Sequence, residues 1–399
     1  MLVLTRYNQG FILITLCFLT IMNTLLTCCE SFSVSSSPTS STTKNSPILT
    51  ISDENSSDEP KFDIGCVANP VILPPNLDCP HNNGEWQCYY YGNAGSWNGG
   101  RKCFLPTGSS GLATSQDGLV WTKVIGQNHE DGSILSPSDD GSGKWDEVQT
   151  GVGDVVRIND ETNELHMYYF GGSDEELSFG PGSIAGFRMR IGRAKSNDNG
   201  RTWVKDDGYL LDYDEGEGLF ASWPRIVKFD DGKPWIMYYH CLDGKKWRVY
   251  HAESTDNGDT WDRKGLVLEG GTQEEDFDFA GIGTRSVVKW KNGLLMIYEG
   301  VDKASIHRLG AAFSEDGKSW SKLNDGKPIL EPFKGPMGEW TKQVIGTPFA
   351  VNMPDGSLRV YHCAKDGPQG QMKIGVVVSE SGEIEPECWT AFEKKESDL

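Results

Sequence analysis

The chain is short of basic residues: 37 Lys and Arg stand against 57 Asp and Glu, which gives a net charge of −20 over 399 residues. Nucleic acids and anionic membrane surfaces attract Lys and Arg, so this shortage argues against both as partners. The sequence also lacks a C-x-x-C pair after its N-terminal leader, and it has no convincing amphipathic helix of more than about three turns. We therefore expect a β-rich protein with an acidic, solvated surface and with neither a metal nor a cofactor.

Long apolar runs are missing except at the N-terminus. There Arg6 precedes an apolar run from Phe11 to Leu26, which is short for a membrane span and suits the core of a signal peptide. We expect residues 1–30 to be a signal peptide that directs the chain into the secretory pathway and leaves no stable membrane span after processing.

Residues 31–59 are rich in Ser and Thr, and no Asp or Glu occurs from Ser31 to Ser52. This stretch resembles the second half of a plastid-targeting leader of algae with complex plastids, where a Phe such as Phe32 follows the signal cleavage site. A disordered linker behind an ordinary secretory signal has the same composition. Both the secretory route and a complex plastid (chloroplast) therefore stay open as destinations, and both place residues 1–59 outside the fold.

Seven cysteines follow the leader, which is an odd number. Four of them could pair with one another around the first repeat described below, although the sequence does not reveal the connectivity. These four are Cys66, Cys79, Cys88 and Cys103.

One short motif recurs along the chain. It reads Ser-Asn-Asp-Asn-Gly-Arg-Thr-Trp at 196–203 and Ser-Thr-Asp-Asn-Gly-Asp-Thr-Trp at 254–261, with shorter copies at 115–121 and 314–320 and a degenerate copy at 379–383. Ser and Asp accept hydrogen bonds from exposed turn N–H groups, Gly supplies a positive φ, and the Trp begins the next strand. Short strands that repeat at intervals of about 60 to 80 residues are typical of propellers.

Each repeat has the same order of elements. A short strand and a turn are followed by an apolar, aromatic strand, then by a third strand that leads into the motif, and a polar fourth strand leaves it. The first strands are expected at 64–73, 153–158, 224–229, 286–290 and 348–353. Four strands in each of five repeats predict an all-β, five-bladed β-propeller as a single domain over residues 60–390, with 391–399 as a C-terminal tail.

Propeller topology assigns the loops to two faces. The repeated turns join third and fourth strands, so they share one face and are expected to be scaffold. The segments that lead into the first strands lie on the opposite face with the ends of the second strands and two long insertions, 126–144 and 171–186. Sites usually occur on long connections that a rigid scaffold supports, so we expect the functional site on this second face.

Acidic residues recur in the segments that lead into the first strands. The fifth repeat has Thr341 at this position, and Asp154 lies deeper, on the first strand of the second repeat. The four lead-in acids are Asp63, Asp146, Glu217 and Asp278. Facing carboxylates are what glycosidic cleavage needs, because one assists the leaving oxygen as a protonated acid while the other, ionised, attacks the anomeric carbon or activates water.

Further polar and aromatic residues are expected beside these acids. The lead-in acids themselves have a structural alternative, since an Asp before a strand often caps a turn and the preceding aromatic residue often packs between blades. For His240 and His362 the alternative is packing at the inner rim. The candidates are His240, Glu299 and His362 at the ends of second strands, Arg225 and Arg285 as orienting cations, and Trp97, Trp145 and Trp223 as surfaces for sugar rings.

The Asp-Gly turn, the Met-Tyr-Tyr strand and the Ser-x-Asp-Gly-x-x-Trp turn together resemble the five-bladed propeller glycoside hydrolases, the clan of invertases, levansucrases and arabinanases, over about residues 60–385. The full turns at 196 and 254 are also similar to the Asp-boxes of six-bladed sialidases, but five repeats favour the first clan. The resemblance implies a carbohydrate substrate, Asp63 as nucleophile or base, Asp146 or Asp154 as the residue that tunes the pKa and orients, and Glu217 as general acid.

The chain departs from this clan in several motifs. The invertase-type Asn-Asp-Pro-Asn, Arg-Asp-Pro and Glu-Cys motifs are absent, and no clear Asp-Pro marks each first strand. The clan also contains phosphorylases and transferases, and Arg225 and Arg285 would suit a phosphate as well as a sugar. A non-catalytic propeller that binds a glycan or a protein, and an unrelated small-molecule enzyme on the same fold, stay open as alternatives.

Overall fold

The computed structural model describes residues 46–76, 84–96, 106–159, 161–179, 182–229, 232–342, 344–367 and 370–392. The expected signal peptide lies outside the described residues, as do Trp97, Cys79, Cys103 and most of the expected C-terminal tail. Cys88 has a free, buried thiol, so the pairing suggested for it is not formed in this structure.

The described residues form five groups of antiparallel strands, numbered here from one to five in chain order. Each group has four strands, and the described chain contains no α-helix. The groups are β1 (Cys66–Leu73), β2 (Trp86–Asn93), β3 (Gly108–Ser115) and β4 (Thr122–Val124); β5 (Gln149–Asn159), β6 (Glu164–Gly172), β9 (Met189–Ser196) and β10 (Val204–Lys205); β11 (Ser222–Val227), β12 (Trp235–Leu242), β13 (Trp247–Ser254) and β14 (Asp262–Glu269); β15 (Gly281–Trp290), β16 (Gly293–Val301), β17 (His307–Ser314) and β18 (Ser321–Lys322); and β19 (Val344–Asn352), β20 (Leu358–Lys365), β21 (Lys373–Ser379) and β22 (Trp389–Ala391).

Short elements complete the described chain. The hairpin β7 (Leu177–Phe179) and β8 (Gly182–Ile184) belongs to the expected insertion between the second and third strands of group two. Three single 3₁₀ turns lie between or beside strands, namely η2 (Asn324–Gly326), η3 (Glu339–Thr341) and η4 (Pro386–Cys388).

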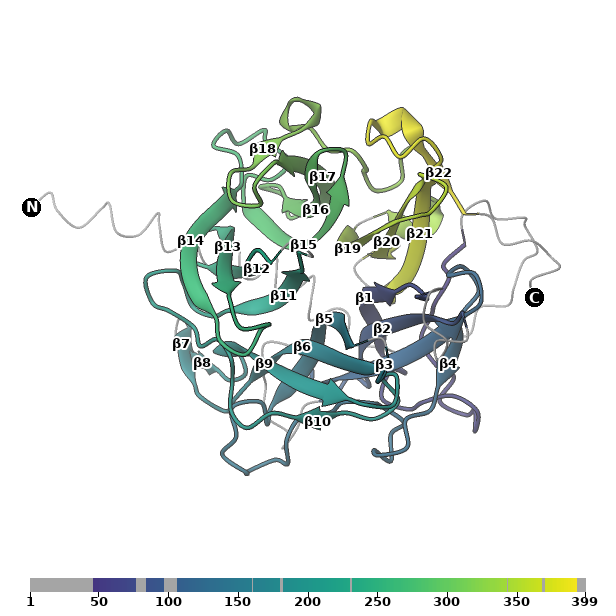
Figure 1. Cartoon of the computed structure of the whole chain (residues 1–399), viewed down its shortest axis with the longest axis vertical. Coiled ribbons are helices and arrows are strands. Elements are labelled where there is room, and N and C mark those ends of the chain that lie inside the picture. Colours follow the sequence, from purple (N-terminus) through teal and green to yellow (C-terminus); the bar gives the residue numbers. More distant parts are fainter. Residues whose placement is uncertain are drawn as a thin grey trace, which may run out of the picture.

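The five groups are arranged around a central axis, with their first strands innermost (Figure 1). Each first strand contacts the first strands of the groups on both sides, and β19 of group five contacts β1 of group one. The fold is therefore all-β and propeller-like, as expected. Hydrogen-bonded pairing between groups is limited in the described residues to single parallel pairs, Trp247↔Gly281 and His307↔Val344.

Most of the first strands begin earlier than expected, because each contains a β-bulge. The pairing of β1 with β2 shifts between Ala68 and Val71, and the same shift occurs in β5, β11, β15 and β19. Pro and Gly at the bulges interrupt the apolar pattern that marked the strands in the sequence, and a bulge tolerates both residues because it leaves one position unpaired. At this bulge, every innermost strand thus has one extra residue relative to the second strand of its group.

The repeated turns join each group to the one before it. In the turn of group two, Ser196 Oγ accepts a hydrogen bond from the N–H of Gly200 at 2.9 Å, and Trp203 Nε1 donates to the Gly200 carbonyl at 3.0 Å. The Trp203 ring packs edge-on against Tyr89 of group one, with ring centroids 5.8 Å apart. A side chain on Gly200 would collide with the Tyr89 hydroxyl, so only Gly fits beside it.

The same contact recurs around the molecule. Trp261 packs on Tyr168, Trp320 on Tyr238, and Trp121 of group one on Tyr361 of group five, with centroids 5.7 to 6.4 Å apart. Tyr361 also donates its hydroxyl to the Gly118 carbonyl at 2.8 Å. The expected scaffold role of the repeated turns is thus visible in their contacts.

The folded part of the chain begins before residue 60, contrary to expectation. The N–H of Ile48 donates to the carbonyl of Ile374 at 2.8 Å, and the N–H of Ile374 donates to the carbonyl of Leu49 at 2.9 Å. Leu49 is buried against group five, and Ser52 accepts a hydrogen bond from Lys123 of group one. The fold begins earlier because the apolar residues Ile48, Leu49 and Ile51 pack against a hydrophobic cluster formed by groups one and five.

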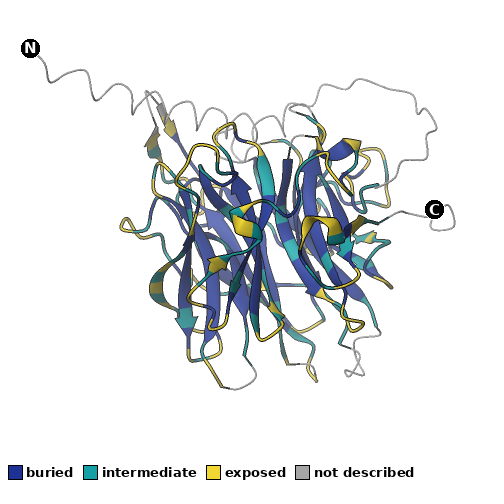
Figure 2. Ribbon diagram, turned by 90° about the horizontal axis from the view of Figure 1, so that it is seen from above, coloured by how far each residue is buried: buried dark blue, intermediate teal, exposed yellow. Residues whose placement is uncertain are grey.

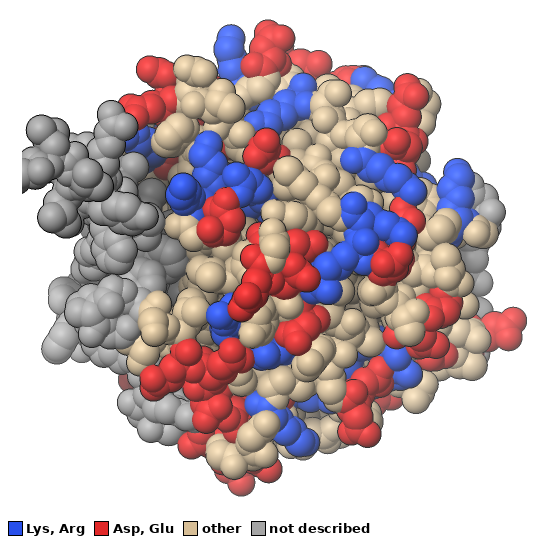
Figure 3. Space-filling model, turned by 90° about the vertical axis from the view of Figure 1, so that its left-hand side faces the viewer, with Lys and Arg blue, Asp and Glu red and all other residues tan. Residues whose placement is uncertain are grey.

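Apolar and aromatic side chains fill the spaces between neighbouring groups. The strands of the inner layers are largely buried, while exposed residues lie at the turns and outer strands (Figure 2). The surface that carries β7, β8 and β14 mixes acidic and basic side chains closely (Figure 3), so the large negative charge does not form one continuous patch there. Among the described residues, no helix has the length and apolar character needed to cross a membrane.

Candidate active site

The four lead-in acids occupy equivalent positions, as expected, but each is tied into its own group. Each carboxylate accepts a hydrogen bond from a Tyr on the second strand and forms an ion pair with a cation on the outer strand. Tyrosine-to-carboxylate distances are 2.8–3.2 Å and cation-to-carboxylate distances are 2.5–3.2 Å. The sets are Asp63–Tyr90–Lys123, Asp146–Tyr169–Lys205, Glu217–Tyr239–Arg263 and Asp278–Tyr298–Lys322.

Group five replaces all three members of this set with uncharged residues. Thr341 stands at the acid position, and His362 stacks on Trp340 with ring centroids 5.6 Å apart, as the tyrosines of groups one, two and four stack on their lead-in aromatic residues. Ala391 pairs with Val377 where the other groups place the cation. Burial lowers the pKa of His362 to about 4, so this His is neutral and needs no acid beside it.

This alignment corrects one expectation about the second strands. His362 is equivalent to the buried tyrosines and not to His240 and Glu299. The residue equivalent to His240 and Glu299 is Cys363, which pairs with Gly346 at the mouth of the channel. His362 therefore belongs to the scaffold of group five.

The structure does not bring the lead-in acids together. Among the described residues, no hydrogen bond or ion pair joins any two of Asp63, Asp146, Glu217 and Asp278. Each is bonded inside its own group, and Asp63, Asp146 and Asp278 are almost completely buried. Asp63 Oδ1 accepts no hydrogen bond in the described part of the chain, since both of its bonds are to Oδ2. Burial raises the pKa of Glu217, against hydrogen bonds from Tyr239 and a charge from Arg263 that lower it.

Three bulge residues have backbone conformations that their side chains disfavour. Asn69, Trp223 and Thr347 each precede a proline on a first strand, and their φ values are 52°, 49° and 44°. Positive φ is costly for a bulky or β-branched residue, and such strain concentrates at functional sites. Two of these residues are bonded to each other across neighbouring groups: the N–H of Asn69 in group one donates to Thr347 Oγ1 in group five at 3.3 Å. The bulges thus define a strained layer across the central channel.

Trp223 is held in this layer by aromatic stacking. Its ring stacks on Phe170 of group two at 4.1 Å and on His240 of its own group at 5.1 Å. The indole is therefore packed against protein rings, which leaves less of it for a sugar than expected. Trp145 is likewise stacked on Tyr169 at 5.3 Å.

Arg285 links group four to this aromatic cluster. Its guanidinium donates to His240 Nδ1 at 3.0 Å, to the carbonyl of Tyr238 at 3.1 Å, and to the carbonyl of Trp223. Because Nδ1 of His240 accepts, its proton is on Nε2, and this buried donor has no partner. Burial, and then the Arg285 charge, hold the pKa of His240 well below its usual range, so the ring stays neutral.

Arg225 lies deeper in the channel. It donates to the carbonyl of Arg285 at 2.9 Å and to Asn69 Oδ1 at 3.3 Å, and its guanidinium carbon lies 5.0 Å from the centre of the Phe349 ring. Neither Arg225 nor Arg285 forms an ion pair with a carboxylate of the described residues, although both are almost completely buried. Burial lowers the pKa of Arg225 to about 10, and its charge is opposed only by the nearby Asp154.

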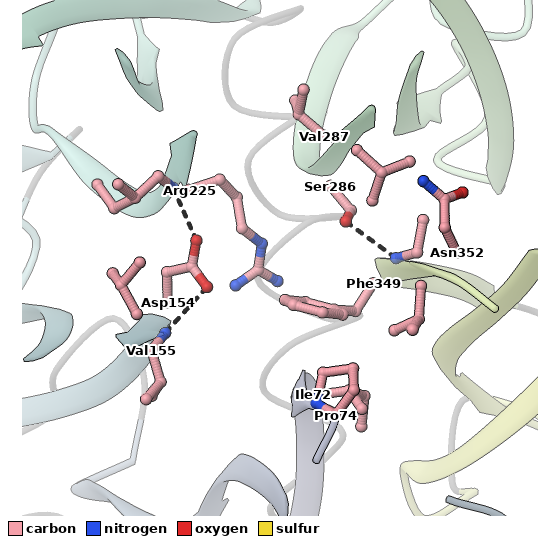
Figure 4. Close-up of a pocket in the computed structure, with 14 residues that line it drawn as sticks. Ile72, Pro74, Asp154, Val155, Arg225, Ser286, Val287, Phe349 and Asn352 are labelled. Atoms are coloured by element: carbon pink, nitrogen blue, oxygen red, sulfur yellow. Dashed lines mark hydrogen bonds between the residues drawn. The ribbon is translucent and has the colours of Figure 1, made fainter. Parts of the chain in front are cut away.

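Asp154 is the predicted catalytic residue that does line the channel. It stands next to Arg225 in a cavity of about 300 Å³ at the ends of the first strands (Figure 4). Its two oxygens accept hydrogen bonds from the N–H groups of Val155 at 2.9 Å and Ile226 at 2.7 Å. Burial raises the pKa of Asp154 to about 6, although Arg225 and these hydrogen bonds lower it.

Glu299 is the second buried carboxylate of the channel. It bonds to His307 Nδ1 at 2.5 Å, to the Thr284 hydroxyl, and to the N–H of Thr347 at 3.1 Å. Burial raises the pKa of Glu299, but the hydrogen bonds and charge of His307 and the bonds of Thr284 and Thr347 outweigh it and keep this pKa below its usual value. Glu299 is therefore ionised where Asp154 is partly protonated.

Sequence reasoning missed several residues of this layer. The sequence shows that Asn69 and Thr347 each precede a proline in a first strand. It does not show that their backbones are strained, because this is known only from their φ values. Thr284 and His307 carried no signal, because neither belongs to a repeated position with an acid. Within the described part of the chain, no group of three or more His, Cys, Asp or Glu side chains could hold a metal ion.

Comparison with known proteins places the fold. No family profile matches the chain. A 1,2-beta-oligomannan phosphorylase of Thermoanaerobacter sp. (strain X514) is 30% identical over 183 residues, which are 44% of this chain and 54% of that protein. The chain thus matches about half the length of this curated relative.

Solved structures resemble the chain over most of its length at low identity. A GH130-family protein, from a study of glycoside hydrolases that target β-1,2 mannosidic linkages in Candida mannan, has a TM-score of 0.56 at 15% identity and covers 91% of this chain and 99% of its own. A thermostable family-43 glycoside hydrolase has a TM-score of 0.54 at 18% identity, with 83% and 95% covered. An N-acetylgalactosamine deacetylase from F. plautii has a TM-score of 0.59 at 17% identity, with 87% and 99% covered. The resemblance to propeller glycoside hydrolases is therefore confirmed at the level of the fold.

Proposed function

We propose that this chain is a carbohydrate-active enzyme that cleaves a glycosidic bond, and that Asp154 and Glu299 are its two catalytic carboxylates. The observation that carries the proposal is that these two buried carboxylates have opposite pKa shifts: the pKa of Asp154 is raised to about 6 and that of Glu299 is lowered. Two carboxyl groups whose environments push their pKa values apart divide naturally into an acid and a base.

Asp154 is the general acid in this scheme. Its protonated form donates to the leaving glycosidic oxygen, and Arg225 beside it stabilises the carboxylate that remains. Glu299, ionised and oriented by His307, Thr284 and the N–H of Thr347, attacks the anomeric carbon or removes a proton from the attacking water. The strained bulges that bring Thr347, Asn69 and Trp223 to the channel would hold the sugar in position between them.

The lead-in acids belong to the scaffold in this proposal. Asp63, Asp146 and Glu217 were the acids implied by resemblance, yet each is bonded to a Tyr and a cation of its own group. The oxygens that accept these bonds are not available to a substrate, and Asp63 Oδ1, which has no partner among the described residues, is buried. The repetition of the same set in Asp278, which no resemblance implied as catalytic, also favours a structural role.

We further propose that the five strand groups are the blades of a closed, five-bladed propeller. This is supported by the ring of contacts among β1, β5, β11, β15 and β19, and by the packing of Trp121 on Tyr361 across the junction of groups five and one. The closure matters for function because it would arrange Asp154 of β5 and Glu299 of β16, which belong to separate groups, around one axis.

A substrate panel tests the function. Protein beginning at Ser46 would be assayed at pH 5 to 8 against a set of glycosides that includes β-1,2-linked manno-oligosaccharides. We expect turnover in the wild type and a loss of kcat of about a hundredfold or more in Asp154→Asn and Glu299→Gln, whereas the exposed control Asp262→Asn stays active. Full activity in both channel variants, or loss on folded Asp63→Asn or Glu217→Gln, would sink the assignment.

Phosphorolysis is the second candidate. Buried donors without partners, His240 Nε2 and Arg285 Nε, lie beside the strained layer and could bind a phosphate, and the curated relative is named as a phosphorylase. Running the same panel with and without inorganic phosphate separates the reactions, because only phosphorolysis yields a sugar 1-phosphate. Binding of a glycan without turnover under either condition would instead favour a non-catalytic propeller.

A further inference from the structure

The channel contains a cavity at the ends of the first strands, on the side away from the segments that lead into them. It has a volume of about 300 Å³, and first strands from all five groups contribute to its wall. In Figure 4, Arg225 extends into this space between Asp154 and Phe349, with Ser286 on the far side. The rest of the wall is mostly aliphatic, from Ile, Val, Ala and Pro side chains.

Among the described residues, the carboxylate that opposes the charge of Arg225 is Asp154, and it does so only while it is ionised. When Asp154 is protonated, the charge of Arg225 is left unbalanced. Arg193, the other arginine that is buried in the described part of the chain, pairs with Asp206 at 2.6 Å. Arg225 and Arg285 have no carboxylate within ion-pair distance among the described residues, although they lie so close that Arg225 donates to the Arg285 carbonyl. A buried cation without a counter-charge is costly by several kcal/mol, and a bound anion removes that cost.

Donors that could hold an anion face the same space. Arg225 Nη1 is buried and has no hydrogen-bond partner. Ser286 Oγ accepts from the N–H of Ala350 at 2.9 Å, so its own hydrogen remains available to donate. One guanidinium and one hydroxyl suit a small ion with few directional needs. A phosphate would leave most of its oxygens unpaired against the aliphatic wall.

We propose that this cavity is a binding site for a small monovalent anion of the halide class, held by Arg225 and Ser286. The cavity shares Asp154 with the proposed catalytic pair, but the existence of the anion site does not depend on the proposed function.

Binding at this site is coupled to the protonation of Asp154. The charged groups that act on Asp154 are Arg225 of β11 and Arg285 of β15, with Tyr168 behind it on β6, and the lining residues of β1 and β19 are not titratable. An ionised Asp154 repels an anion, so the anion binds more tightly as pH falls through the pKa of Asp154. By reciprocity, a bound anion offsets the Arg225 charge and keeps Asp154 protonated to higher pH. If Asp154 is the general acid, the anion extends activity towards neutral pH, and this last step rests on the proposed function.

Thermal unfolding measures the binding without any need for turnover. Melting temperature would be followed against chloride and bromide at constant ionic strength with gluconate as the balancing anion, at pH 5.5 and pH 8. We expect a saturable rise at pH 5.5, at least tenfold weaker binding at pH 8, and at least tenfold weaker binding in Arg225→Gln. Ser286→Ala should bind about threefold more weakly, and Arg201→Gln, which removes an arginine at the surface, should bind as the wild type does.

Crystals soaked in bromide locate the ion. The anomalous peak is expected in the cavity, within about 3.5 Å of Arg225 Nη1. The proposal is overturned if the peak lies elsewhere, or if Arg225→Gln keeps the wild-type halide response. If Arg225→Gln does not fold, an unchanged affinity in Ser286→Ala overturns it. A saturable response to phosphate but not to halide would also overturn it, and halide binding in a protein without turnover would defeat only the proposed function.

Discussion

Asp154 gives the clearest consequence at the scale of a single residue, because its pKa is raised from 3.8 to about 6 by burial. The folded state therefore holds the proton more tightly than the unfolded state does. Stability is lost as pH rises from about 4 to about 6, where the unfolded chain has released the proton first, and it is regained on acidification. The pH-dependent loss from this residue is at most about 3 kcal/mol.

We expect the wild type to lose free energy of unfolding between pH 4 and pH 6 relative to Asp154→Asn, whose side chain does not titrate. Urea unfolding of both proteins at each pH measures the difference, and only its slope with pH matters, since Asn also leaves one N–H of Val155 or Ile226 without an acceptor. Parallel pH profiles for the two proteins would show that Asp154 has an ordinary pKa.

The sequence identified Asp154, Glu299 and both buried arginines as candidates, yet it could not sort them from the lead-in acids. A carboxylate that ends an apolar strand and one that precedes a strand look alike in a sequence as possible site residues. Their roles depend on Tyr90, Lys123 and their counterparts, which come from other strands and are brought together only by the fold.

At the scale of the strand group, the buried acid–tyrosine–cation set is the unit that joins the lead-in segment to the inner and outer strands. In group one, Lys123 pairs with Asp63 at 2.7 Å, and the two side chains are 7% and 0% exposed. Removing the cation leaves Asp63 buried without a counter-charge, so Lys123→Met is expected to lower the free energy of unfolding by about 3 kcal/mol. Chemical denaturation measures this loss.

Group five indicates how the loss can be reversed, since it has uncharged residues at all three positions. Adding Asp63→Asn to Lys123→Met should recover much of the lost stability, because no unpaired charge remains. Lys264→Met serves as the control, since Lys264 pairs with the exposed Asp262 at the surface and its loss should change little. An effect of Lys123→Met no larger than that of the control would contradict the structural role.

The order and type of the strands were predictable from the sequence, and the starts of most first strands were not. Alternating aromatic residues and repeated turns mark the second and third strands directly. Pro224, Gly283 and Pro348 lie at bulges of first strands, and in the sequence they look like the point where a strand begins or ends. Pairing with the second strand shows that each first strand continues through the bulge.

At the scale of the whole molecule, the segment before Ser52 fastens group five to its neighbour. Ile48 and Leu49 pair with Ile374 of β21, while Ser52 bonds to Lys123 of group one. A chain that begins at Ser52 loses the pairing and exposes the surface that Leu49 covers. We expect its melting temperature to fall by several degrees relative to a chain that begins at Ser46.

A matched substitution separates the covering of apolar surface from chain length. Leu49→Ala in the longer chain should cause part of the same decrease, because the main-chain pairing with Ile374 remains. Identical melting curves for the two chain lengths would mean that residues 46–51 contribute nothing to the fold.

The Trp of each Ser-Asp-Gly-Trp hairpin packs against a tyrosine of the preceding group. In the first hairpin, Trp121 packs against Tyr361 of the last group. Contacts between neighbouring groups therefore do not require that the two groups follow each other in the sequence. Circular permutants whose old ends are linked and whose new ends open at the hairpin near Asp198 or Asp316 would keep every one of these supports except the one that is cut. We expect such permutants to fold, and a loss of the folded state in both would show that the contact between the first and last groups is not sufficient to hold them together.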